Sequence, residues 1–133
     1  MIRMKPRFLV DTHVLLWWFF GDRRLSKKAS ETLKNPENEV LVSSASAWEV
    51  STKFRLGKLP NAAEIIRDFP ALLKKGRLEM LAISIEHALE AGSLPGPHRD
   101  PFDRMLAAQA RWEDIPLVSS DSIFKNFPIK VIW

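Results

Sequence analysis

The sequence contains no cysteine in its 133 residues. Disulfide bonds and thiolate zinc sites therefore cannot hold the fold, and a cysteine nucleophile is excluded. The sequence also has no long hydrophobic run, because the longest uninterrupted one, Val14 to Phe20, is far shorter than the roughly 20 residues that a membrane-spanning helix needs. We therefore expect a soluble, cytoplasmic protein with no membrane partner.

Basic residues open the chain, as they do in signal peptides. Arg3, Lys5 and Arg7 precede apolar residues, but Asp11 and His13 interrupt the stretch that follows, so we expect no processing. A hydrophobic content of 46% is enough for one core, and residues 1–133 are expected to form a single domain. The net charge of +4 fits a polyanionic partner or an ordinary solvated basic surface equally well.

Histidine is scarce and scattered. The three histidines, His13, His87 and His98, share no metal-ligand spacing and no evident acid–base pairing. A mechanism driven by histidine acid–base chemistry is therefore not expected.

Short apolar runs alternate with helical patterns along the chain. The runs that predict strands are residues 8–10, 40–42, 78–83, 116–118 and 129–132. The segments that predict helices are residues 14–20, 27–34, 45–56, a stretch from 60 that Pro70 interrupts, 85–91 and 102–112. This alternation predicts a parallel sheet covered by helices on both faces.

Acidic residues follow or flank these strands. Asp11 follows the first strand, Glu49 lies in the helix after the second, and Asp121 follows the fourth. Asp100 and Asp103 open the helix that precedes the fourth strand. Because ligands of such sheets bind at the carboxyl ends of the strands, all five acids are placed to reach one edge.

Each acid also has a purely structural interpretation. Asp11 and Asp121 are placed to cap helical turns, and Ser46 to Glu49 matches a capping box. Asp100 and Asp103 occupy the cap and third positions of their helix, where negative charge is favourable. Helix starts in this architecture always fall at the same edge, so location alone does not decide between capping and metal binding.

The choice of residue type favours metal binding. Serine, threonine and asparagine cap helices as well as aspartate does and do not repel one another. We expect the acids to converge without a counter-charge of their own, and hard oxygen ligands of this kind suit Mg²⁺ or Mn²⁺. Thr12, Ser119 and Ser120 are placed to support the carboxylates or bound water.

Four segments together carry a resemblance to a known family. They are Phe8 to His13, Ser43 to Glu49 with Lys53 and Gly57 to Leu59 behind it, His98 to Ala110, and Leu117 to Asp121. In this order they resemble PIN-domain nucleases, in particular the VapC-type toxins of bacterial and archaeal toxin–antitoxin modules. The match spans nearly the whole chain.

The resemblance implies a three-layer α/β/α fold with a five-stranded parallel sheet and the activity of a metal-dependent endoribonuclease. It implies that the catalytic and metal-binding acids are Asp11, Glu49, Asp103 and Asp121, which would hold Mg²⁺ or Mn²⁺ for the attack of water on an RNA phosphodiester. Asp100 does not align with the family's acid, and we expect it to be a cap or an outer supporting residue.

Further contacts are expected around this site. His98, Arg99, Lys53 and Arg104 are candidates for binding RNA phosphates, although each is equally compatible with a solvated surface. The aromatic run Trp17 to Phe20 is too bulky for one buried stripe, so part of it is expected to form a contact surface unless it is a broad core helix. The resemblance implies two protein partners, a second copy of the chain in a homodimer and a cognate antitoxin.

Three other functions compete with that of a toxin nuclease. A phosphoryl-accepting receiver domain needs an aspartate just after the third strand, where this chain has Ile83 and Ser84. A solitary RNA-processing PIN nuclease would share the same site. A non-catalytic PIN-fold module that binds RNA or protein would typically have lost some of the acids, whereas here the whole set is present.

Overall fold

A short parallel sheet forms the centre of the computed structural model, which describes residues 4–133, so that Arg3 of the basic start lies outside the described residues. All strand pairs are parallel, and the strand order is β3-β2-β1-β4-β5. The strands are β1 (Arg7–Val10), β2 (Glu39–Ser43), β3 (Glu79–Leu81), β4 (Leu117–Val118) and β5 (Val131–Ile132). The expected five-stranded parallel sheet is confirmed.

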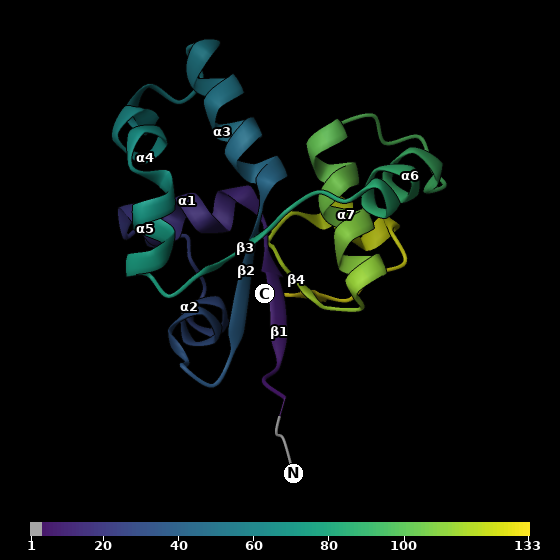
Figure 1. The fold of residues 1–133 in the computed structure, drawn as a ribbon, viewed down its shortest axis with the longest axis horizontal. Helices are drawn as coiled ribbons and strands as arrows, with labels where there is room; N and C mark the ends of the chain where they lie inside the picture. The colour runs from purple at the N-terminus through teal and green to yellow at the C-terminus, as the bar shows by residue number, and fades with distance from the viewer. Residues whose placement is uncertain (1–3) are drawn as a thin grey trace.

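Helices cover both faces of this sheet. They are α1 (Thr12–Phe20), α2 (Lys27–Lys34), α3 (Ser44–Arg55), α4 (Ala63–Arg67), α5 (Phe69–Lys75), α6 (Ile85–Ser93) and α7 (Pro101–Glu113), with the 3-10 helices η1 (Pro60–Ala62) and η2 (Ser122–Asn126). Helices α1 to α5 lie on one side of the sheet, and α6 and α7 lie on the other (Figure 1). The expected three-layer α/β/α architecture is therefore confirmed.

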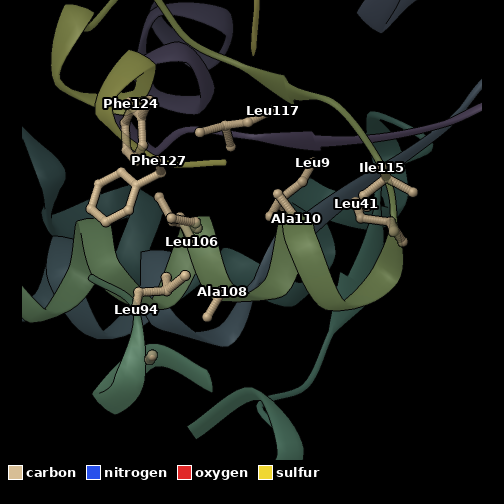
Figure 2. Packing of buried hydrophobic residues seen from close by; sticks show 12 residues of the cluster. Leu9, Leu41, Leu94, Leu106, Ala108, Ala110, Ile115, Leu117, Phe124 and Phe127 are labelled. Carbon is tan, nitrogen blue, oxygen red and sulfur yellow. The ribbon is translucent and has the colours of Figure 1, made fainter. Parts of the chain in front are cut away.

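Alternate side chains of the central strands pack on opposite faces. Leu9 of β1 is in register with Leu41 of β2 and Leu117 of β4, and all three are buried in one cluster with Leu106 of α7 and Phe124 of η2. Figure 2 shows side chains of this cluster gathered between the sheet and α7. The leucines thus fix α7 against the sheet.

The opposite face is formed by valines. Val10 of β1 is in register with Val118 of β4, and both pack with Val14 and Leu15 of α1 and with Leu73 of α5. Because strands of such a sheet are buried on both faces, their sequences are apolar without interruption. This burial accounts for the runs that predicted β1, β2 and β4.

Several element ends differ from their predictions for local reasons. The strand expected over residues 78–83 is only Glu79–Leu81, on the exposed edge of the sheet. Helix α6 continues through Gly92 to Ser93, and Pro70 lies in the first turn of α5, where its missing N–H disrupts no helical bond. The strand expected over 129–132 is shortened to Val131–Ile132.

The aromatic run of α1 is partly covered. Trp17, Trp18 and Phe19 are half-buried, whereas Phe20 at the end of the helix is exposed. Trp17 packs against Trp133 at the chain end, with ring centroids 5.8 Å apart. Within the described part of the chain, no helix combines the length and the apolar character needed to cross a membrane.

Candidate active site

Asp11 lies at the carboxyl end of the central strand β1, immediately before α1. Asp11 is buried, with 3% of its surface exposed. It occupies the N-cap position of α1, yet its side chain makes no capping hydrogen bond. Instead the Asp11 Oδ2 atom accepts a hydrogen bond of 2.8 Å from the Ser119 hydroxyl, which follows β4. The capping interpretation of the Asp11 carboxylate is therefore wrong.

Glu49 is brought to the same edge by α3. The helix begins one turn earlier than a capping box at Ser46 would require, because Ser43 is its N-cap and accepts from the Ala45 N–H at 2.9 Å. Ser46 is buried and its hydroxyl lies 2.8 Å from that of Thr12, which links α3 to the start of α1. Glu49 therefore lies in the second turn of α3, and its side chain is 4% exposed.

Asp100 and Asp103 have different tasks at the start of α7. Asp100 is the N-cap, and its Oδ1 atom accepts from the N–H groups of Phe102 (2.9 Å) and Asp103 (3.1 Å). The Asp103 side chain is 17% exposed and takes no part in capping. Its Oδ2 atom is bonded to His98 Nε2 at 3.0 Å. The expected cap role of Asp100 is confirmed, and the Asp103 carboxylate is free for another role.

Asp121 lies at the margin of this group. It is exposed, and its Oδ1 atom accepts from the Ile123 N–H at 3.1 Å, so it caps η2. Its own N–H donates to the Ser119 hydroxyl at 3.0 Å. Ser119 thus bridges the Asp121 backbone and the Asp11 carboxylate, whereas the neighbouring Ser120 is exposed.

Burial and mutual repulsion act on the carboxylates of Asp11, Glu49 and Asp103, which we call the acidic cluster. Burial raises the pKa of Asp11; the hydrogen bond from Ser119 opposes this effect and the Glu49 charge adds to it. The surroundings of the Asp11 carboxyl group therefore disfavour its charged form.

The pKa of Asp103 depends on a similar balance between burial, which raises it, and a hydrogen bond, which lowers it. Burial raises its pKa to about 6, against the lowering effect of the His98 hydrogen bond, and the charges of Asp100, Asp11 and Glu49 raise it further. Acids from the end of β1, from α3 and from α7 therefore act on one another electrostatically. Helices α3 and α7 also contact each other directly, and both rise beside the ends of the central strands (Figure 1).

The expectation that the acids lack a counter-charge is wrong. Lys53, one helical turn after Glu49 on α3, places its Nζ atom 2.5 Å from Glu49 Oε2. Partial burial lowers the pKa of Lys53, but the hydrogen bond to Glu49 and the charges of Asp100 and Asp103 outweigh it, so that the pKa is raised. The ammonium group is therefore part of the acidic site.

The donor chemistry of the cluster fits a hard divalent cation. Within residues 4–133, no three Asp, Glu or His side chains are close enough to hold a metal ion as they stand. Nitrogen groups contact two of the carboxylates, Lys53 at Glu49 and His98 at Asp103. The oxygens themselves are of the type that Mg²⁺ and Mn²⁺ prefer. Burial and, to a smaller extent, neighbouring negative charge raise the pKa values of Asp11 and Asp103, and a bound cation would stabilise both acids in their ionised form.

Arg104 has a structural role in the loop between α6 and α7. Its guanidinium donates to the carbonyl oxygens of Ala91 (2.9 Å), Leu94 (2.6 Å) and His98 (3.0 Å). These bonds hold the loop that carries His98. The expected contact of Arg104 with an RNA phosphate stays a prediction.

The other predicted rim residues separate into two kinds. Lys53 and His98 point to carboxylates of the acidic cluster, and Arg99 is exposed beside His98. An aromatic pair that was not predicted lies between α3 and α7, where Trp48, 57% exposed, packs edge-on against Phe102 with ring centroids 4.6 Å apart. Trp48 and Phe102 each precede an acid of the cluster in sequence.

Comparison with known proteins assigns this architecture to a family. The PIN domain family model matches residues 8–130, and the chain belongs to the PIN-domain family, whose members are generally nucleases that use divalent metal ions. The predicted resemblance is thus confirmed for family and fold. No curated protein is significantly similar in sequence.

Several solved structures share this fold, and three of them are named as VapBC or toxin–antitoxin complexes. A chain of VapBC2 from Rickettsia felis, bound to a promoter DNA fragment, is 19% identical with a TM-score of 0.70, covering 95% of this chain and 97% of that one. A chain of VapBC-1 from nontypeable Haemophilus influenzae is 14% identical with a TM-score of 0.65, and the match covers 95% of this chain and 96% of that one. A chain of a toxin–antitoxin complex from Klebsiella pneumoniae is 17% identical with a TM-score of 0.64, and the match covers 94% of this chain and 95% of that one.

In the absence of metal, Asp103→Asn is expected to raise the melting temperature at pH 7.5. The folded-state pKa of about 6 lies above the ordinary 3.8, so this group stabilises the fold fully below about pH 4 and loses that contribution as the pH rises through 6. A pKa difference of that size corresponds to at most about 3 kcal/mol, whereas the lost helix-terminus interaction is worth about 0.3 to 1 kcal/mol.

Thermal unfolding of both proteins in chelator checks this expectation. The variant should melt higher than wild type at pH 7.5, and the advantage should be absent at pH 4. A variant that melts lower at both pH values would show that Asp103 acts as a helix-end residue and that its repulsion by the cluster is negligible.

Proposed function

We propose that this chain is a metal-dependent endoribonuclease in which Asp11, Glu49 and Asp103 hold Mg²⁺ or Mn²⁺. The observation that carries the proposal is that these three carboxylates, buried at Asp11 and Glu49 and largely buried at Asp103, serve no capping role, although two of them lie at helix starts. Removing an acid from water is unfavourable for the fold, and acids with raised pKa values gather at functional sites. Asp121 would support the site from its margin, through its link to Ser119.

Each side chain has a defined part in this mechanism. The bound cation would supply a Lewis acid for the phosphate and lower the pKa of water. Ser119 fixes the Asp11 carboxylate through Oδ2, and His98 fixes Asp103 through Oδ2. The Thr12–Ser46 contact holds α1 and α3 at a constant separation, so that Asp11 and Glu49 keep their relative positions.

The proposed substrate is single-stranded RNA, cleaved by water. Support comes from membership in a family of nucleases and from the net positive charge of +4. Arg99 is exposed, follows His98 in sequence, and would be available to a phosphate. Because the attacking group is water, the products should carry 5′-phosphate and 3′-hydroxyl ends.

Purified protein is expected to cleave single-stranded RNA with Mg²⁺ or Mn²⁺ and to stop in chelator. Asp11→Asn should reduce the rate by about 100-fold or more, because it removes a charged oxygen ligand. Asp121→Asn should have a smaller effect, because that carboxylate caps η2. Asp22→Asn is a matched control, since this half-buried residue is paired with Arg24 and is not part of the acidic cluster.

End-group analysis of the cleaved RNA separates this mechanism from its rivals. Products with 2′,3′-cyclic phosphate ends that persist in chelator would overturn the proposal. Equal loss of activity in Asp11→Asn and Asp22→Asn would show that the acidic cluster has no special role.

We also propose that the protein is the toxin of a toxin–antitoxin pair, acts in the cytoplasm as one domain, and forms a homodimer. Three solved structures of similar fold are complexes named VapBC or toxin–antitoxin. The exposed Phe20 at the end of the aromatic α1 offers apolar surface for a protein contact. The alternative is a solitary RNA-processing PIN nuclease with the same chemistry.

Expression alone is expected to arrest growth, and co-expression with the product of the adjacent gene should relieve the arrest and yield a stable complex. Pull-down with size-exclusion chromatography measures both the complex and the subunit number. Harmless expression of active enzyme with no copurifying neighbour would favour the solitary nuclease and leave the cleavage chemistry intact.

A further inference from the structure

Lys53 reaches into the acidic cluster from within the same helix that carries Glu49. The i, i+4 spacing on α3 places the two side chains on one face, and Nζ lies 2.5 Å from Glu49 Oε2. The Lys53 side chain is 30% exposed, whereas that of Glu49 is 4% exposed. The ammonium group therefore sits at the boundary between solvent and the buried acids.

This ion pair differs from an ordinary surface pair in its surroundings. Besides Glu49, the charges of Asp100 and Asp103 act on Lys53, although these residues belong to α7. By contrast, the ion pair of Arg67, at the end of α4, with Asp68 joins exposed side chains. Surface ion pairs contribute little to stability. The Lys53 ammonium differs from them because acids of both α3 and α7 act on it, so it compensates negative charge from two helices.

We propose that Lys53 is a built-in counter-ion that a divalent cation must replace at Glu49. The proposal rests on the metal-dependent function proposed above and adds the regulation of that site. In the metal-free protein the ammonium neutralises part of the acidic cluster. When a divalent cation binds, the flexible stem of Lys53 carries the ammonium away toward solvent, where it is available to a substrate phosphate.

Electrostatics determines whether removal of the Lys53 charge strengthens or weakens metal binding. Glu49 Oε2 is already in a short hydrogen bond with Nζ, so a cation binding there must break that bond and overcome repulsion by the ammonium charge. Removing the charge of Lys53 should therefore tighten metal binding and at the same time weaken the metal-free fold. A lysine that merely orients Glu49 would have the opposite effect on metal affinity.

The experiment is a calorimetric Mn²⁺ titration of the full chain at pH 7.5, without RNA, in wild type, Lys53→Gln, Lys53→Arg and Lys58→Gln. Lys58 lies just beyond α3, is exposed, and its substitution changes the net charge by the same amount. We expect Lys53→Gln to bind Mn²⁺ about tenfold more tightly than wild type, a change equivalent to about 1.4 kcal/mol. Lys58→Gln and Lys53→Arg should stay within about twofold of wild type.

Thermal unfolding of the same proteins gives a second readout. In chelator, Lys53→Gln should melt below Lys58→Gln, and saturating Mn²⁺ should remove the difference by mass action. The charge-preserving Lys53→Arg keeps the test valid if the glutamine variant folds poorly, because it should retain both wild-type affinity and wild-type stability.

The outcomes separate this proposal from the one on which it rests. If Lys53→Gln and Lys58→Gln bind Mn²⁺ equally, or if Lys53→Gln binds more weakly than wild type, the counter-ion role is overturned while the metal mechanism stands. If none of the four proteins binds Mn²⁺, both proposals are overturned.

Discussion

Repulsion among buried carboxylates is the constraint on which the rest of this structure depends. Asp11, Glu49 and Asp103 come from three separate elements and meet at the carboxyl edge of the sheet, where burial and mutual charge raise the pKa of Asp11 and Asp103. Such an arrangement weakens the fold, so it requires a rigid scaffold and partial compensation. Lys53, Ser119 and His98 provide that compensation, each by one hydrogen bond to a different acid.

The scaffold is rigid because both faces of the central strands are buried. Leucines of β1, β2 and β4 fix α7 on one face, and valines of the same strands fix α1 on the other. The acids lie in or next to elements that pack against the sheet, so the hydrophobic core determines their positions. Local polar contacts then refine the site: Asp100 caps α7, the Thr12–Ser46 contact joins α1 to α3, and Arg104 holds the loop of His98.

The sequence was sufficient for the features that depend on periodicity and local spacing. The apolar runs predicted β1, β2 and β4, and the position of each acid relative to its strand predicted the shared edge. The Glu49–Lys53 pair was also readable, because i, i+4 spacing places oppositely charged side chains together on a helix. The capping box at Ser46 was wrong because Ser43, the last residue of β2, already caps the helix.

Other features depend on contacts that no local pattern encodes. The His98–Asp103 bond and the three carbonyl contacts of Arg104 require the particular path of the loop between α6 and α7. Nothing in the sequence distinguishes Arg104 from a solvated arginine until its neighbours are known. The shortening of β3 reflects its position at the exposed edge of the sheet, where one neighbour is missing.

The central claim is that the acidic cluster is a binding site for a divalent cation. Anomalous diffraction from crystals of the protein grown with Mn²⁺ tests it most directly, because the scattering identifies both the ion and its ligands. The account predicts an anomalous peak about 2.0 to 2.3 Å from oxygens of Asp11 and Asp103, with the Lys53 ammonium displaced from Glu49. Crystals with saturating Mn²⁺ that show no peak at these acids, and in which Lys53 still holds Glu49, would contradict it.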